Sequence, residues 1–227
     1  MNTIVDKAVV LRRTNYGEAD RIVSFLTENN GKVTCLAKGV RKQKSKMAGG
    51  IEPYCQVEIT FIKGRGGMAT LTSSKIVTHY GNFMTNYARL ELAQNIIKTI
   101  DRQTEDSSEP EYFILTVDAL EQVNSSIDDR ILELWWLAKY LSTAGSGLNT
   151  SSQTNGQKLQ ENKVYLFDLD SGGFFAHPEG VFSPNHIKYL KLACYNTPDK
   201  LLKVTNATDL SNDLLPSIRS FIKLHTN

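Results

Sequence analysis

The hydrophobic side chains of this chain change their spacing near residue 80, and that change limits the folds open to it. Before this point they form short β-branched runs or alternate, so that Val57, Ile59 and Phe61 would share one face of a strand. After it they recur every three or four residues, as in the helical stripe from Leu90 to Ile100. The sequence therefore predicts an α+β protein with a β domain over 1–80 and a mainly helical domain over 81–227.

The first domain is expected to be a small β-barrel. Strand-like runs occur at 7–11, 21–26, 32–38, 56–62 and 68–73. The first run is expected to end in a turn over Thr14–Gly17, and glycine-rich turns follow at Asn29–Gly31 and Gly64–Gly67. Five short strands of this kind predict an OB-fold, which closes its edges and leaves loops for a ligand. The pattern also fits a sandwich or an SH3-like barrel.

The second domain is expected to be helical with one β element. Helical patterns occur over 87–100, 108–123, 128–145, 185–194 and 209–225, and Pro216 is expected to kink or split the last of them. Between the third and fourth helices, the polar segment 146–161 reads as a flexible loop. It is followed by a β-hairpin over 163–177, with its tip at Asp170–Gly172.

Charge is divided unevenly along the chain. The 227 residues carry 26 Lys and Arg against 24 Asp and Glu, so the net charge of +2 says little about partners. Residues 1–80, however, hold 13 basic and 6 acidic side chains, a balance of +7, which leaves −5 for residues 81–227. The first domain is therefore the one expected to bind a polyanion.

The strongest local signal is the segment Lys38–Lys46, in which five of nine residues are basic and none is acidic. It lies between two predicted strands, where an exposed loop would contact phosphates and release their counterions. Tyr16, flanked by Arg12, Arg13 and Arg21, is the best candidate for stacking on a base. The alternatives are a merely solubilising loop and a structural role for Tyr16.

Catalytic and metal-binding motifs are missing from the sequence. It has no GxxxxGK[ST] phosphate loop, no GxSxG nucleophile motif and no HExxH motif. Cys35, Cys55 and Cys194 include no CxxC pair, so they predict neither a disulfide framework nor a four-cysteine zinc site. The histidines are scattered, at His79, His177, His186 and His225. We therefore expect no enzymatic activity, no cofactor and no metal.

The sequence gives no sign of a membrane address. No run approaches the roughly 18 apolar residues that a membrane span needs. The first residues lack the apolar core and the small-residue cleavage site of a signal peptide. A cytoplasmic location is expected.

The N-terminal part of the chain contains a series of short motifs: AVVLRR at 8–13, YGEADRIV at 16–23, LT at 26–27, GKV at 31–33, AKGVRK at 37–42 and SK at 45–46. In these motifs the chain resembles the RecO family of bacterial recombination mediators. The order and spacing of these matches extend well beyond a single short motif. The C-terminal part agrees more weakly, in helix order, in the hairpin residues Gly172–Phe174 and in length.

The resemblance implies a protein that binds single- and double-stranded DNA, anneals complementary strands and acts at the nucleoid. It also implies partnership with RecR and with the acidic C-terminal tail of single-strand-binding protein (SSB), and through them the loading of RecA onto SSB-coated DNA. Carried over by position, with Tyr16 added for stacking, the DNA-binding candidates are Arg12, Arg13, Tyr16, Arg21, Lys38, Arg41, Lys42, Lys44 and Lys46.

For the SSB tail, an apolar pocket with a basic rim is expected in the helical domain. The available rim residues are Arg102, Arg130, Lys139, Lys188 and Lys191. In one respect the chain departs from the family, many of whose members carry four cysteines in a zinc-binding element. The corresponding region, roughly 160–183, has no cysteine here. We expect no zinc, and a hairpin held instead by packing of Tyr165, Phe167, Phe174 or Phe175.

Other functions fit parts of the same pattern. A generic OB-fold RNA-binding protein would share the basic loop and Tyr16, but would prefer RNA and ignore SSB. A protein adaptor would keep its nucleic-acid affinity unchanged after charge reversal at Arg41, Lys42 and Lys44. An enzyme of unknown type is disfavoured by the missing motifs.

Overall fold

The computed structural model describes residues 3–45, 47–64, 66–104 and 109–225. Two residues named in the sequence analysis lie outside these ranges. They are Lys46, a candidate DNA-binding residue, and Ser108, the expected start of the second helix. The chain divides into two compact units, Met1–Ser125 and Ser126–Asn227. The boundary expected at residue 80 coincides with the end of the last barrel strand. The first compact unit extends further, to Ser125, and so includes the first two helices as well as the barrel.

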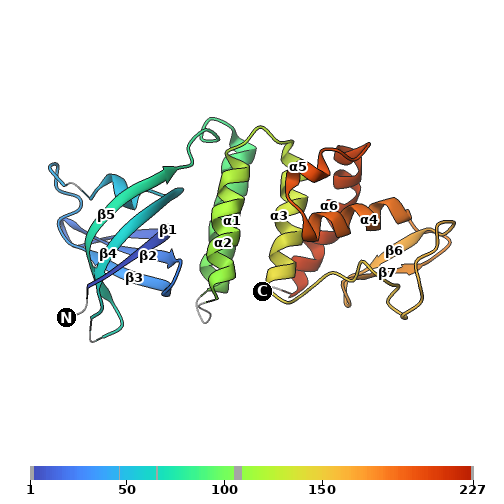
Figure 1. Cartoon of the computed structure of the whole chain (residues 1–227), viewed down its shortest axis with the longest axis horizontal. Coiled ribbons are helices and arrows are strands. Elements are labelled where there is room, and N and C mark those ends of the chain that lie inside the picture. The colour runs from blue at the N-terminus through green and yellow to red at the C-terminus, as the bar shows by residue number, and fades with distance from the viewer. Residues whose placement is uncertain (1–2, 46, 65, 105–108, 226–227) are drawn as a thin grey trace. The chain divides into compact units, whose positions relative to one another are not determined.

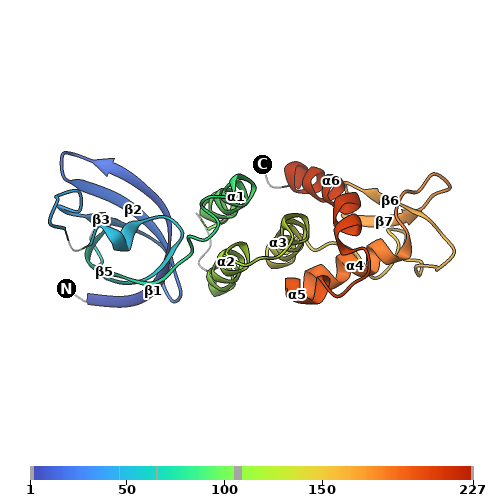
Figure 2. The same cartoon turned by 90° about the horizontal axis from the view of Figure 1, so that it is seen from above.

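The first unit contains a closed five-stranded barrel (Figures 1 and 2). Its strands are β1 (Thr3–Tyr16), β2 (Asp20–Thr27), β3 (Gly31–Ala37), β4 (Cys55–Ile62) and β5 (Ala69–His79), with a short 3₁₀ turn η1 (Gly49–Ile51) before β4. The strand order is β1-β2-β3-β5-β4, and β1 closes the barrel by pairing with β4. Only the β3–β5 pair is parallel among these five strands. The expected OB-fold is confirmed over the sandwich and SH3-like alternatives.

β1 is longer than the sequence pattern indicated. Its pairing with β2 continues past a bulge between Val10 and Arg12 as far as Tyr16, which lies opposite Asp20. The turn expected over Thr14–Gly17 is therefore wrong, because the chain reverses only after Tyr16. Gly17, the first turn residue, has φ of +56°, a conformation that glycine adopts at little cost.

The strand β2 is buried on both faces. Val23 and Phe25 point into the barrel core, where Val57, Ile59 and Phe61 are also fully buried as predicted. Ser24 and Leu26, on the opposite face, are almost as inaccessible. That face is covered by the antiparallel neighbours α1 (Tyr87–Gln103) and α2 (Pro110–Val123), which contact each other and β1, while α2 also contacts β2 (Figure 1).

The second unit is built around α3 (Asp129–Thr143). It contacts α4 (Pro184–Tyr195), α5 (Pro198–Leu201) and α6 (Ala207–His225). Pro216 does not split the last helix, since α6 continues through it as one helix. No helix in the described residues is long and apolar enough to cross a membrane.

The polar segment 146–161 has no helix and no strand, but it is tied to the hairpin that follows it. Asn149 N donates to Gly172 O at 2.9 Å, and Thr154 N donates to Phe174 O at 2.9 Å. Gln153, only 4% exposed, accepts the Ala176 amide on its side-chain oxygen at 3.1 Å. The polar composition of the segment predicted a flexible loop, because composition alone does not show hydrogen bonds to residues distant in the sequence.

The hairpin pairs β6 (Tyr165–Asp168) with β7 (Gly173–Ala176). Its tip at residues 169–172 is closed by Asp168, which accepts hydrogen bonds from the Asp170 amide and the Ser171 hydroxyl. The bond from Ser171 is the main reason why the pKa of Asp168 lies below its ordinary value. Asp168, the last residue of β6, thus stabilises the turn that follows it.

Aromatic packing supports the hairpin. Phe174 is fully buried and meets Phe167 and Phe182 edge to face, with ring centroids 5.1 and 5.6 Å apart. Phe167 also meets Phe221 of α6 at 5.9 Å. The sequence predicted the contributions of Tyr165, Phe167 and Phe174, but not those of Phe182 and Phe221, which lie outside the hairpin.

Candidate nucleic-acid interface

The basic loop of residues 38–45 lies against the turn that joins β1 to β2. Arg41 makes two of the contacts: its backbone amide donates to Ala19 O at 2.9 Å and its Nη1 donates to Gly17 O at 3.2 Å. The Gly39 amide donates to the Asp20 carboxylate at 2.6 Å. Two segments about twenty residues apart in the sequence therefore form one continuous edge of the barrel.

The loop has a buried anchor and an exposed rim. Val40 is 2% exposed and belongs to the barrel core. Gly39, at φ of +65°, turns the chain so that Val40 points inward, while the basic side chains around it point to solvent. Together with the adjacent residues of β1 and β2, they form what we call the basic surface: Arg13, Tyr16, Arg21, Lys38, Arg41, Lys42 and Lys44.

Arg13 and Arg21 share one face of the β1–β2 hairpin and one acidic partner. Asn15 pairs with Arg21 across the two strands and accepts from its Nε at 3.2 Å. Arg13 Nη1 donates to Glu52 Oε1, and Arg21 Nη1 lies 3.7 Å from the same oxygen. The two arginines are 30% and 23% exposed, so they are more enclosed than the loop lysines. Nothing in the sequence spacing indicated the role of Glu52.

Arg12 is separated from the basic surface. It lies opposite Ser24 on the face of β1 that carries the helices, because successive residues of a strand point to opposite faces. Its Nε is 3.7 Å from Asp101 Oδ2 of α1, and Lys32 Nζ is 2.6 Å from Oδ1 of the same carboxylate. The structure therefore gives Arg12 a place in the contact between barrel and helix. Strand alternation could have distinguished it from Arg13.

Tyr16, the candidate for stacking on a base, is exposed at the end of a strand. It is the last residue of β1 and is 54% exposed. Phe25 and Phe61 are buried in the barrel core and are not available for contact with a base. Tyr54 packs edge to face against Phe83 at 5.3 Å. Tyr16 pairs with Asp20, so it points to the face of the hairpin opposite Arg13 and Arg21, and it is linked to the basic loop through the adjoining turn that Arg41 contacts. An accessible ring near cations is a combination used to bind single strands.

The three thiols are buried and poorly suited to chemistry. Burial raises the pKa of Cys35 to about 12 and that of Cys194 to about 11, and it also raises the pKa of Cys55. In the described part of the chain, no three His, Cys, Asp or Glu side chains gather as a metal site would require. The hairpin region, with aromatic rings at its centre and no cysteine, does not fit the zinc element of the family.

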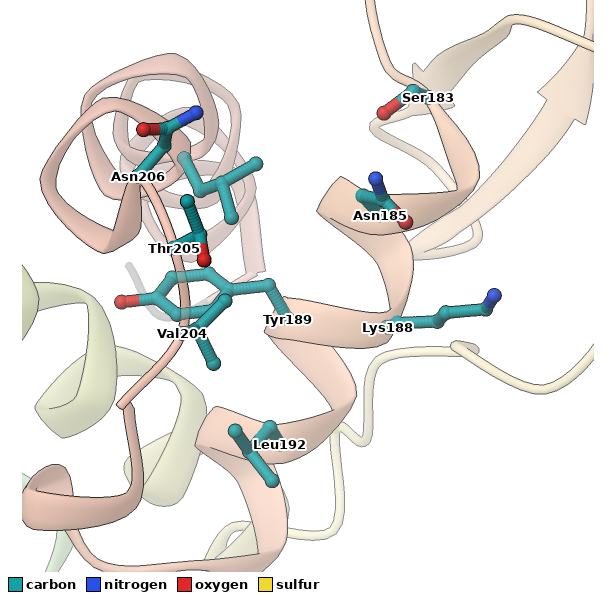
Figure 3. A pocket seen from close by; sticks show the side chains of 9 residues that line it. Ser183, Asn185, Lys188, Tyr189, Leu192, Val204, Thr205 and Asn206 are labelled. Carbon is teal, nitrogen blue, oxygen red and sulfur yellow. The ribbon is translucent and has the colours of Figure 1, made fainter. Parts of the chain in front are cut away.

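A pocket of about 530 Å³ opens in the second unit (Figure 3). Its apolar lining comes from Tyr189 and Leu192 of α4, and from Val204 and Leu210. Lys188 also lines it and, in Figure 3, extends from α4 to the side away from Tyr189. Its Nζ donates to Glu161 at 2.7 Å, in a pair that is largely exposed.

The other four candidate rim residues lie elsewhere. Arg102 belongs to α1 of the first unit, and Arg130 and Lys139 belong to α3. Lys191, one turn after Lys188, approaches the Ser151 hydroxyl at 3.4 Å. Lys188 is therefore the candidate that the structure associates with an apolar pocket.

One chain of Ser, His and Asp side chains occurs next to this pocket. His186 Nδ1 is 2.9 Å from Ser183 Oγ, and its Nε2 is 3.1 Å from Asp213 Oδ2. Nδ1 also accepts from the backbone amide of Ser183 at 3.1 Å, the reciprocal bond of a helix capping box. His186 therefore caps the N-terminus of α4, and the arrangement of Ser183, His186 and Asp213 is that of a helix cap.

Comparisons with known proteins agree with this architecture. Residues 1–80 match the family model described as "Recombination protein O N terminal", and residues 84–227 match "Recombination protein O C terminal". Three similar proteins are each named "DNA repair protein RecO". The one from Bifidobacterium longum is 37% identical over 123 residues, which cover 53% of this chain and 51% of the relative. The chain thus spans about half the length of that relative.

The other two relatives extend the match. The protein from Desulfatibacillum aliphaticivorans is 31% identical over 149 residues, which cover 64% of this chain and 58% of the relative. The protein from Dehalococcoides mccartyi is 26% identical over 226 residues, which cover 96% of this chain and 88% of the relative. Because the two family models together cover both the barrel and the helical part, the chain belongs to the recombination protein O (RecO) family.

Proposed function

We propose that this chain is a non-enzymatic DNA-binding recombination mediator. It binds single- and double-stranded DNA through the basic surface and anneals complementary strands. With RecR it helps to load RecA onto SSB-coated single strands. The family and the names of the relatives support a role in DNA repair, and the chemistry of the barrel supports binding to a polyanion.

The observation that carries the proposal is the contact of the basic loop with the β1–β2 turn. Arg41 and Gly39 bind this turn through backbone and side-chain hydrogen bonds, which places Lys38, Lys42 and Lys44 on the same edge as Tyr16. Cations that track a phosphate backbone beside a ring that stacks on bases give binding with little dependence on sequence. Such a surface binds two complementary strands equally well, as annealing requires.

The test is strand annealing with two complementary labelled oligonucleotides, bare or coated with SSB, at two salt concentrations. We expect the protein to accelerate annealing on both kinds of strand, and less so at high salt. The variant Arg41→Ala/Lys42→Ala/Lys44→Ala should lose the acceleration. If each of the three side chains neutralises one phosphate, the salt dependence of single-strand binding should fall by about 2 in log–log slope.

A matched control removes the same charge elsewhere on the barrel. Lys7, Lys63 and Lys75 are exposed and lie outside the loop and the β1–β2 turn. The variant Lys7→Ala/Lys63→Ala/Lys75→Ala should keep most of the annealing activity. Equal losses in both triple variants would assign binding to overall charge and not to this surface. No acceleration by the unaltered protein would refute the mediator function.

The pocket beside α4 supports a second part of the proposal, a site for the acidic tail of SSB. Its apolar lining suits the apolar end of such a tail, and Lys188 suits a carboxylate. The exposed pair between Lys188 and Glu161 contributes little stability, so a peptide carboxylate can replace Glu161 at low cost.

A labelled peptide with the sequence of the SSB tail tests this site by fluorescence anisotropy. Lys188→Glu should abolish binding through charge repulsion. Lys191→Glu, one turn further along the same helix but outside the pocket lining, is the matched control and should bind nearly as well. If both variants or neither lose the peptide, the tail binds elsewhere.

The alternatives make different predictions in the same experiments. An RNA-binding protein would bind an RNA oligonucleotide more tightly than the same DNA sequence and would not respond to SSB. A protein adaptor would retain its nucleic-acid affinity in the triple loop variant. The capping role of His186 gives no support to an enzyme.

A further inference from the structure

Glu52 is the acidic side chain enclosed by the arginines of the basic surface. Its Oε1 accepts from Arg13 Nη1 and lies 3.7 Å from Arg21 Nη1. Its own side chain is 44% exposed, and both arginines are less exposed than that. A carboxylate therefore already binds Nη1 of Arg13 and lies close to Nη1 of Arg21, two donors that a phosphate could otherwise use.

The backbone on both sides of Glu52 is firmly held. Ile51, immediately before it, is fully buried in the barrel core. Gly50 lies so close to β5 that an added Cβ would be 2.7 Å from the Ser74 carbonyl oxygen, and Ser74 Oγ donates to Gly50 O. After Glu52, Tyr54 has φ of +60° and accepts the Tyr80 amide at 2.9 Å. The carboxylate is thus presented to the arginines by a fixed segment of the barrel.

The chemistry of this contact is that of a phosphate contact. Guanidinium groups bind carboxylate and phosphate oxygens with the same donors and in the same forked geometry. DNA can therefore engage Arg13 and Arg21 only by displacing Glu52 or by tolerating its negative charge. The loop cations Lys38, Lys42 and Lys44 are exposed, so a phosphate can reach them more easily than it can reach the arginines.

We propose that Glu52 is a built-in competitor for DNA phosphate at Arg13 and Arg21, and that it keeps DNA binding weaker and more easily reversed than the basic surface would otherwise allow. This inference rests on the proposed function, because it assumes that the basic surface is the DNA site. A mediator has to release the strand that it delivers or anneals, and an internal anion that returns to the arginines favours release.

The test is the equilibrium affinity of Glu52→Gln for a fluorescein-labelled poly(dT) oligonucleotide, measured by anisotropy over a range of salt concentrations. Glutamine keeps the size and a hydrogen-bond acceptor but removes the charge. We expect roughly two- to tenfold tighter binding at low salt, since partly exposed ion pairs have modest energies. If both arginines then neutralise phosphates, the log–log salt slope should steepen by about 1.4.

Two controls isolate the competition. Glu58→Gln makes the same change in net charge at an exposed position of β4 and should raise the affinity much less. In the background Arg13→Ala/Arg21→Ala, the further change Glu52→Gln should have no effect, because the groups for which it competes are gone. An equal gain in that background would overturn the inference in favour of general electrostatics.

The other outcomes are also decisive. Unchanged or weaker binding of Glu52→Gln, with wild-type folding by circular dichroism, would overturn the competitor role and leave Glu52 as a support for the arginines. Failure of the proposed function has a different signature: the unaltered protein would not bind poly(dT), or the triple loop variant would bind it as well as the unaltered protein does.

Discussion

The two β elements of this protein are stabilised in different ways. The barrel of the first unit closes on itself, so each of its five strands pairs on both edges and its core is internal. The β6–β7 hairpin of the second unit has only two strands, which are marginal alone in water. It relies on Phe182, on Phe221 of α6 and on the segment 146–161.

This difference indicates where each unit can vary. The barrel holds its binding residues on loops and edges outside a closed core, so they can change without loss of the fold. The hairpin has no core of its own, so its rings support the strands directly. Four experiments test this difference between the two units.

The largest expected effect is on thiol reactivity, which reports on each unit separately. Because burial raises the pKa of Cys35 from 9.0 to about 12, its thiolate population at pH 8 should be about a thousandfold below that of an unfolded thiol. Iodoacetamide should therefore modify the native protein very slowly. With increasing urea, Cys35 and Cys194, which lie in different units, should become reactive at different concentrations. Simultaneous exposure would mean that the two units unfold together.

Removal of one buried ring should distinguish the two β elements. Phe174→Ala should destabilise the second unit by about 3–5 kcal/mol, because it empties the centre of the hairpin packing. Phe61→Ala should cost about as much in the barrel. Urea unfolding monitored by labelling of Cys194 should detect the destabilisation caused by Phe174→Ala and not that caused by Phe61→Ala. A loss below about 1 kcal/mol for Phe174→Ala would show that strand pairing alone holds the hairpin.

Tyr16→Ala should weaken single-strand binding by about 1–3 kcal/mol if one base stacks on the ring. Tyr16→Phe keeps the stacking surface and is the control, so it should bind nearly as the unaltered protein does. Anisotropy with labelled DNA measures both. Because Tyr16 is exposed at the end of β1, neither change should alter thermal stability. Equal affinities of the alanine and phenylalanine variants would exclude stacking.

The smallest expected effect tests the contact between barrel and α1. Asp101→Asn should cost about 1–2 kcal/mol, because Lys32, with a side chain only 12% exposed, loses the charge of the carboxylate 2.6 Å away and keeps only its weaker bonds, such as the one to the Asp101 carbonyl oxygen. Arg12→Ala should cost below about 1 kcal/mol, since its side chain is 61% exposed. It should also reduce DNA affinity less than Arg41→Ala does. A larger loss of affinity for Arg12→Ala would return Arg12 to the DNA site.

Local patterns predicted the elements well but not their partners. The alternation of Val57, Ile59 and Phe61 identified β4, and the stripe after Leu90 identified α1, because each depends on residues close in sequence. That β1 pairs with β4, or that α1 and α2 cover β1 and β2, depends on contacts across dozens of residues. Apolar spacing shows which face is buried but not what covers it.

The candidate site was predicted to a similar degree. The uneven distribution of charge along the chain and the local density of cations pointed to the loop around Arg41, and its contact with the β1–β2 turn adds spatial support. The pairing of Glu52 with Arg13 and Arg21 could not be predicted, because it joins positions about thirty to forty residues apart that share no pattern. Lys46, one of the candidates, lies outside the described residues.

Closure of the barrel by β1 and β4 has a consequence for the timing of folding. Thr3 pairs with Ile62, and Cys35 of β3 pairs in parallel with Ala69 of β5. Contacts between residues so distant in sequence form slowly, because a long loop must be ordered before any of them is gained. During synthesis, β1 can pair with β2 early, but the barrel cannot close until β5, which ends at His79, has emerged from the ribosome, and until then its apolar core residues are open to chaperones.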